Sequence, residues 1–175
     1  MTLDELYQRA YSEGIEIDDI RMRELEEVCF PEGWIAIDSH KFDTLVELKC
    51  TLAHAIGHCE TGSFYNIYSP YDIKEKCERK ADRRAAEILM PLPDVRRALR
   101  RGITEPWMLA ELFDVTVTFA ETALAIYDED IRHKHRQIAV GFPQLIRACD
   151  LPRPVRPTIP QESYVLENDP FVPPF

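Results

Sequence analysis

The chain has 175 residues, a formal charge of −10 and a hydrophobic fraction of 45%. This length suits one domain or one domain with a small appendage, and the hydrophobic content excludes an intrinsically disordered chain. The acidic balance argues against a protein that wraps nucleic acid, and no apolar run approaches the roughly 20 residues of a membrane span.

The cysteines and the first residues indicate the cellular compartment. Five cysteines are scattered through the sequence, an odd number that favours reduced thiols over a disulfide scaffold. The first ten residues contain acidic side chains and no apolar core of the kind that a secretory signal needs. We therefore expect a cytoplasmic protein.

The first third of the chain predicts a helix and a β-hairpin. Residues 3–12 have the pattern of a short helix, which ends near Gly14. Residues 28–30 and 34–37 are apolar runs, rich in β-formers, that flank a Pro-Glu-Gly turn, and this arrangement predicts two antiparallel strands.

A long helix is predicted to follow, capped by Ser39 or Asp43 and running to about Cys59. Four apolar residues recur in it at the spacing of one buried helix face: Leu45, Leu48, Leu52 and Ile56. We expect these four side chains to form a stripe against the core.

Helices dominate the rest of the chain. A loop over residues 61–71 leads to a second long helix over 73–90. Three shorter helices are predicted, over residues 93–101, 105–113 and 118–127, whereas residues 131–149 have no clear pattern. Seven of the thirteen prolines lie in the last 24 residues, so residues 151–175 are expected to form an extended tail.

Residues 103–127 have the character of a helix-turn-helix unit. In DNA-binding units of this kind, the second helix enters the major groove and reads bases with cationic side chains. Here that helix, over residues 116–127, carries Glu121 and no arginine or lysine. Direct DNA binding is therefore not expected, and we predict that the unit packs on the rest of the protein.

Two histidines form the first candidate metal site. His54 and His58 are four residues apart in a predicted helix, so both imidazoles leave the same face, one turn apart. That separation allows two nitrogens to bind one Zn²⁺. A structural site of His54, His58, Cys59 and Cys77 also has suitable atoms, but Cys59 is rotated by about 100° from His58 on the helix.

Two carboxylates on the next helix extend the candidate site. Glu78 offers a third metal ligand, and Asp82, one turn later, could accept a hydrogen bond from a metal-bound histidine and orient it. From the residues alone, a solvated helix face rich in ion pairs is the better explanation of both carboxylates.

Three blocks of sequence resemble the ImmA/IrrE family of metallopeptidases, which comes from prophages and mobile elements. Residues 52–65 (LAHAIGHCETGSFY) are similar to the active-site helix of that family, and residues 78–91 (ERKADRRAAEILMP) to its following motif. Residues 109–116 match a third family feature. The blocks occur in the family's order and spacing, so the resemblance covers about residues 34–127.

The resemblance implies an α+β fold in three parts. Residues 1–102 would form a small zincin-like domain, in which a short sheet packs against the motif helix. Residues 103–150 would form the helix-turn-helix-like portion, and residues 151–175 the proline-rich tail.

The resemblance also implies the site chemistry. In the family motif H-E-x-x-H the histidines bind zinc and the glutamate is the general base. Carried over, His54, His58 and Glu78 would bind Zn²⁺ and Asp82 would orient a ligand. The position of the base is Ala55, whose methyl group cannot accept a proton. Loss of a general base slows a reaction by roughly 10²–10⁴-fold, so we expect an inactive or strongly impaired chain.

Two explanations for Ala55 compete: an engineered replacement of glutamate, and a natural pseudoenzyme that kept its pocket for binding. We favour the engineered replacement, because the rest of the motif is intact and a drifting pseudoenzyme would be expected to lose ligands as well.

Three tyrosines follow the motif helix: Tyr65, Tyr68 and Tyr71. One of them, with Tyr65 as the candidate, could donate a hydrogen bond to the oxyanion that forms on a scissile carbonyl. We favour the alternative, in which the rings pack over the helix.

By resemblance, the function is a zinc-dependent endopeptidase that cleaves a helix-turn-helix repressor of a prophage or mobile element. The alternative is a catalytically silent zincin that binds a repressor or another protein partner. For the peptidase we expect the substrate to lie extended beside the strand over residues 34–37.

Overall fold

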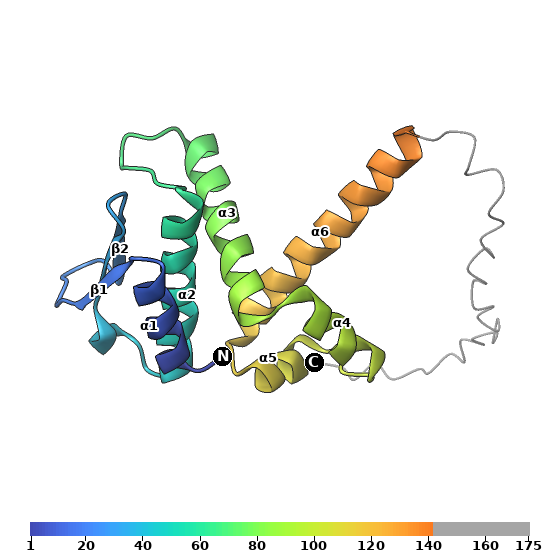
Figure 1. Ribbon diagram of the computed structural model, residues 1–175, viewed down its shortest axis with the longest axis horizontal. Coiled ribbons are helices and arrows are strands. Elements are labelled where there is room, and N and C mark those ends of the chain that lie inside the picture. Colours follow the sequence, from blue (N-terminus) through green and yellow to red (C-terminus); the bar gives the residue numbers. More distant parts are fainter. Residues whose placement is uncertain (142–175) are drawn as a thin grey trace, which may run out of the picture. The chain divides into compact units, whose positions relative to one another are not determined.

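The computed structural model describes the backbone of residues 1–141 and the side chains as far as Arg132; the predicted tail, 151–175, lies outside the described residues. Within this part, six α-helices and a three-stranded sheet form an α+β fold, as predicted (Figure 1). The elements in chain order are α1 (Leu3–Ser12), β1 (Glu16–Asp19), β2 (Glu27–Phe30), β3 (Trp34–Ile37), the 3₁₀-helix η1 (Ser39–Lys41), α2 (Leu45–Thr61), α3 (Tyr71–Leu89), α4 (Leu92–Arg100), α5 (Pro106–Phe113) and α6 (Val117–Gly141).

The sheet is mixed, and β3 is its central strand. β3 pairs in parallel with β1 and antiparallel with β2, so the predicted hairpin of β2 and β3 is confirmed. The sequence did not reveal β1, because three of its four residues are acidic and only Ile17 is apolar. Both edges of β3 are occupied by neighbouring strands. The expectation that a substrate lies beside residues 34–37 is therefore wrong, and the edge near the motif helix belongs to β2.

Helix α2 begins later than predicted. Thr44, rather than Ser39 or Asp43, is its N-cap, and it forms a reciprocal capping box with Glu47. Leu45 is 72% exposed, so it is not part of the predicted stripe. It occupies the first helical position, before the helix reaches the core. The other three members of the stripe are buried as predicted: Leu48, Leu52 and Ile56.

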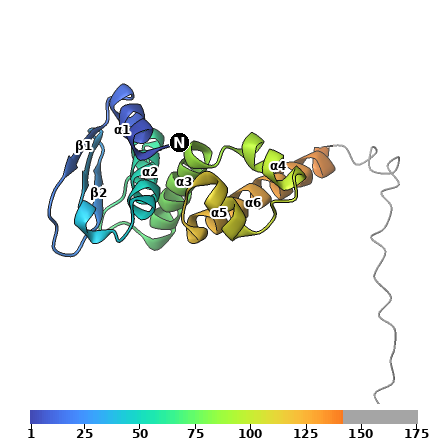
Figure 2. The same cartoon turned by 90° about the horizontal axis from the view of Figure 1, so that it is seen from below.

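Helix α2 lies between the sheet and helix α3 (Figures 1 and 2). The contact with α3 is close because its residues are small. A Cβ atom on Gly57 would lie 2.5 Å from the carbonyl oxygen of Ala81, and Ala81 and Ala85 are both fully buried. The two long helices therefore approach each other at the level of the candidate metal ligands.

Helix α6 continues well past the predicted end at residue 127. It includes Arg132, so the absence of cations holds only for its first half. The helix contacts α3: the hydroxyl of Tyr127 donates to the carbonyl of Met90 at 2.8 Å, and Arg83 pairs with Asp130 at 2.7 Å. The buried side chains of α5 and α6 join those of α2 and α3 in one hydrophobic cluster.

An ion pair connects helix α2 to the end of helix α5. The buried Lys49 of α2 pairs with Asp114, the residue that ends α5 in the left-handed conformation. This ion pair connects the motif helix to the turn before α6. Among the described helices, none combines the length and the apolar character needed to cross a membrane.

The substitution Gly57→Ala tests the close approach of α2 and α3. In an ordinary helix this change is favourable by about 1 kcal/mol. Here the new methyl group would collide with the backbone of α3, so we expect a destabilisation of about 1–3 kcal/mol in urea unfolding. Helix propensity alone predicts that Gly57→Ala stabilises the protein. A stabilised variant would therefore contradict the close packing of α2 and α3.

Candidate metal centre

Three side chains converge between α2 and α3. The Nε2 atoms of His54 and His58 lie 3.0 Å apart. One oxygen of Glu78 lies 3.2 Å from Nε2 of His54, and the other lies 3.4 Å from Nε2 of His58. The structure thus brings together the three residues that the sequence nominated as ligands, and they are a group of the kind that could hold a metal ion.

The size of this triangle fits a metal ion. With zinc–ligand bonds of about 2.0–2.1 Å, neighbouring ligand atoms of a tetrahedral site lie roughly 3.3–3.4 Å apart. The observed separations of 3.0–3.4 Å are close to that value. Two imidazole nitrogens with one carboxylate are also a donor set that catalytic zinc sites use, with the fourth position left for water.

The second nitrogen of each histidine has a partner that fixes the ring. Nδ1 of His54 lies 2.8 Å from Oδ1 of Asp82, as predicted for an orienting carboxylate. Nδ1 of His58 lies 2.6 Å from the carbonyl oxygen of Ser63, which can only accept a hydrogen bond. In the neutral rings, both Nε2 lone pairs are therefore available to a cation.

The carbonyl of Ser63 is a functional group that the sequence analysis missed. Helix α2 ends at Gly62, which has a φ of 61° in the left-handed region. The chain then turns back, and Ser63 is buried beside the helix. A Thr-Gly pair after an apolar helix predicts such an ending, but nothing in the sequence shows where the next carbonyl points.

The two histidines experience different electrostatic surroundings. Burial lowers the pKa of His58, and the nearby His54 lowers it further. Burial also lowers the pKa of His54, but the hydrogen bond to Asp82 and the charges of Glu27, Asp82 and Glu78 outweigh this effect and raise the pKa. Three carboxylates thus favour positive charge at the pair, and a divalent cation would supply it.

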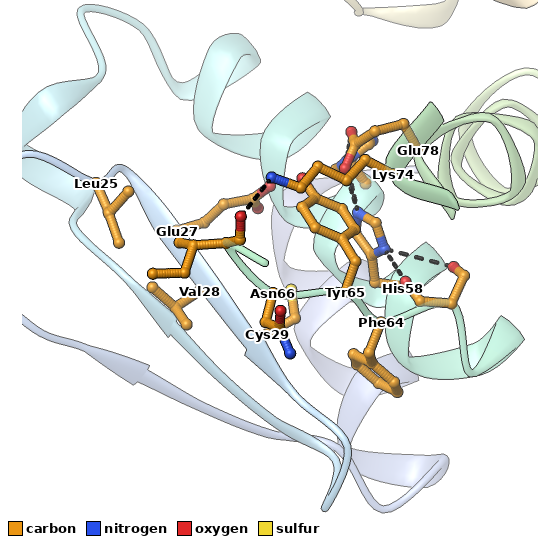
Figure 3. A pocket seen from close by; sticks show the side chains of 13 residues that line it. Leu25, Glu27, Val28, Cys29, His58, Phe64, Tyr65, Asn66, Lys74 and Glu78 are labelled. Atoms are coloured by element: carbon orange, nitrogen blue, oxygen red, sulfur yellow. Dashed lines mark hydrogen bonds and ion pairs between the residues drawn. The ribbon is translucent and has the colours of Figure 1, made fainter. Parts of the chain in front are cut away.

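A cavity of 370 Å³ opens over the three ligands, and strand β2 forms one of its walls. Figure 3 shows Glu27 reaching from β2 into this cavity, across from Glu78, His58 and Tyr65. The Oε2 atom of Glu27 is closed off from solvent and has no hydrogen-bond partner among the described residues. Burial raises the pKa of Glu27 to about 7, with smaller contributions from neighbouring carboxylates.

The position of the missing base lies between the two histidines in the sequence of α2. Ala55 is fully buried, and its carbonyl accepts a hydrogen bond from the thiol of Cys29 at 3.6 Å. The alternative cysteine-containing metal site is not formed. Cys77 directs its thiol to the carbonyl of Phe64, and Cys59 interacts with the thiol of Cys29.

The three tyrosines do not behave alike. Tyr68 and Tyr71 are 88% and 81% exposed, so the expectation that they pack over the helix is wrong. Tyr65 lines the cavity and meets the His58 ring edge-on, with 6.2 Å between centroids. Its interaction with Glu78 raises the pKa of Tyr65 to about 12, so the hydroxyl stays protonated and can donate a hydrogen bond near neutral pH.

A second group of acidic residues and a histidine lies away from this cavity, at Asp19, Asp38 and His40. Its carboxylates already have backbone partners. Asp19 accepts hydrogen bonds from Ser39, and Asp38 accepts from the amides of Met22 and His40. The group is therefore explained by the turn that it stabilises.

The comparison with known families identifies one relationship. A peptidase family model described as the IrrE N-terminal-like domain matches residues 21–125, which include all three candidate ligands and β2. No curated protein and no solved structure matches the chain significantly.

Removal of the carboxylate ligand tests the metal centre. We expect the unmodified chain, stripped of metal and reloaded under reducing conditions, to bind about one Zn²⁺, and Glu78→Gln to bind it far more weakly. Asp82→Asn should weaken binding by about 10–100-fold, because it removes only the orienting hydrogen bond. Asp72→Asn, an exposed change on the same helix, is the control. Equal affinity of Glu78→Gln and the unmodified chain would exclude this site.

The burial of Glu27 predicts a pH-dependent effect on stability in the metal-free protein. Its pKa is raised from 4.5 to about 7 in the folded state, so the folded protein binds the extra proton between these values. Stability from this group is therefore lost as the pH rises from 4.5 to 7, by at most about 3 kcal/mol. In urea unfolding with a chelator present, the free energy of unfolding of Glu27→Gln should rise relative to that of the unmodified chain as the pH increases from 4.5 to 7.

The matched control for this measurement is Glu26→Gln, which removes the same charge from an exposed neighbouring side chain. A stability difference between Glu27→Gln and the unmodified chain that stays constant from pH 4.5 to 8 would show that Glu27 is solvated in the folded protein.

Proposed function

The chain belongs to the peptidase family described as the IrrE N-terminal-like domain, and from this membership we propose that it is a zinc-dependent endopeptidase acting on a helix-turn-helix repressor of a prophage or mobile element. The family supports a function of the metallopeptidase type. The observation that carries the proposal for this chain is the triangle of His54, His58 and Glu78, whose size and donor atoms suit a catalytic zinc ion.

In this proposal each residue around the cavity has a separate task. His54, His58 and Glu78 would hold the zinc, which would polarise the scissile carbonyl and make water more acidic. Asp82 and the Ser63 carbonyl keep the two imidazole rings in place. These contacts hold the ligands before substrate arrives, so little reorganisation is needed during the reaction.

The substrate would bind along β2. This strand lies at one end of the sheet, and its residues line the wall of the cavity next to the ligands. An extended peptide can pair with such a strand through backbone hydrogen bonds, which places its carbonyls beside the metal centre. Tyr65, across the cavity, would donate a hydrogen bond from its hydroxyl to the oxyanion.

We place this reaction in the cytoplasm, where a repressor would meet the protein. The four cysteines that the structure describes are free thiols, which suits a reducing compartment.

Ala55 supports a second candidate function, in which the protein binds its partner without cutting it. The position that provides the general base in the H-E-x-x-H motif is a buried methyl group here. The three ligand positions are unaffected, because that glutamate does not bind the metal. A silent zincin that sequesters a repressor would therefore keep the cavity and the zinc.

The substitution Ala55→Glu separates the two candidates. We expect it to raise zinc-dependent cleavage of the proposed helix-turn-helix repressor substrate by about 10²–10⁴-fold, because it adds a proton acceptor to the motif helix. Gel electrophoresis with and without a chelator measures the cleavage. Leu45→Glu adds the same charge at an exposed position of α2 and is the control. If Ala55→Glu binds zinc and the repressor but cuts nothing, the binding function is the correct one.

A further inference from the structure

The cavity above the metal ligands contains a carboxylate that the reaction described above does not use. Glu27 begins β2 and lines the cavity together with His54, His58 and Glu78. Its Oε2 atom is buried and has no partner in the described part of the chain. A buried carboxylate oxygen is normally hydrogen-bonded, so Glu27 can accept a hydrogen bond that the described residues do not supply.

The strand register places Glu27 opposite the motif helix. Side chains two residues apart on a strand share a face, so Glu27 and Cys29 point the same way. Cys29 contacts the carbonyl of Ala55, and Glu27 lines a second hollow together with Thr51 and His54. Glu27 therefore lies over the turn of α2 that leads into position 55.

The motif helix offers no acceptor at position 55. Ala55 is fully buried, and its side chain ends at a methyl group. In this chain, the carboxylate that occupies the region between β2 and α2 comes from the strand.

We propose that Glu27 supplies, from strand β2, the proton acceptor that the motif helix lacks at position 55. The proposal rests on the proposed peptidase function and adds a catalytic residue to it. The attacking water would donate a hydrogen bond to the Glu27 carboxylate from the cavity that this side chain lines.

The chemical step is a balanced hydrolysis. The oxygen of water forms a bond to the scissile carbonyl carbon as one proton passes to the Glu27 carboxylate. Glu27 then gives this proton to the amide nitrogen, the C–N bond breaks, and a carboxylic acid and an amine leave. Glu27 returns to its starting state, so no other reactant is needed.

The first test does not depend on cleavage. Acetohydroxamate chelates a metal, and its proton must pass to a nearby acceptor. With Co²⁺ in the site, visible absorption reports both metal loading and hydroxamate binding. We expect Glu27→Gln to take up Co²⁺ like the unmodified chain but to bind acetohydroxamate about 10–100-fold more weakly, the loss expected for one hydrogen bond to a charged group. Glu26→Gln, an exposed neighbour, should bind normally.

A rescue variant tests whether a carboxylate at position 55 can replace the one at position 27. In Glu27→Gln/Ala55→Glu the carboxylate is moved from strand to helix, and acetohydroxamate affinity should return. Equal affinity of Glu27→Gln and the unmodified chain would overturn the proposal. So would failure of Glu27→Gln to bind Co²⁺, because Glu27 would then be holding the metal.

Cleavage of the proposed repressor substrate separates the role of Glu27 from the proposed peptidase function. We expect the unmodified chain to cut slowly, Glu27→Gln to lose this activity by at least about tenfold, and the double variant to cut. If the double variant cuts while Glu27→Gln cuts as fast as the unmodified chain, the peptidase function stands and the role of Glu27 fails. If no variant cuts, the peptidase function fails, and with it the role of Glu27, which rests on it.

Discussion

The close contact between α2 and α3 is the constraint on which the candidate site depends. Its ligands come from two helices, and a zinc ion tolerates little error in their spacing. Gly57 permits the approach, because any side chain there would meet the carbonyl of Ala81. Ala81 is one turn from Glu78 and next to Asp82, so the contact also sets the height at which both carboxylates meet the histidines. The same buried cluster includes side chains of α5 and α6.

The two pairs of candidate site residues follow from helical periodicity, whereas the link between the pairs came from the resemblance to the family motif. Spacings of four residues place His54 with His58 and Glu78 with Asp82, and only the packing of the two helices had to be supplied by the fold. Features that depend on distant contacts could not be predicted. The carbonyl of Ser63 is one of these, since backbone groups have no sequence signature. The strand β1 is another, because its acidic residues resemble a loop until β3 pairs with them.

Two neighbouring glutamates in the acidic first third of the chain, Glu26 and Glu27, differ in their exposure to solvent. Glu26 is exposed, whereas Glu27 begins β2 and turns toward the helix. Glu26 precedes the strand, so the change from an exposed to a half-buried carboxylate occurs where β2 begins. A count of charges treats both residues alike, whereas the pairing of β2 with β3 fixes the place of Glu27.

The burial of Glu27 also bears on the origin of Ala55. An intact set of ligands, taken alone, suggests that a glutamate was removed from position 55. The proposed role of Glu27 gives Ala55 a second explanation. If strand β2 supplies the proton acceptor, the motif helix does not need one at position 55, and an intact set of ligands beside Ala55 no longer requires that a glutamate was removed.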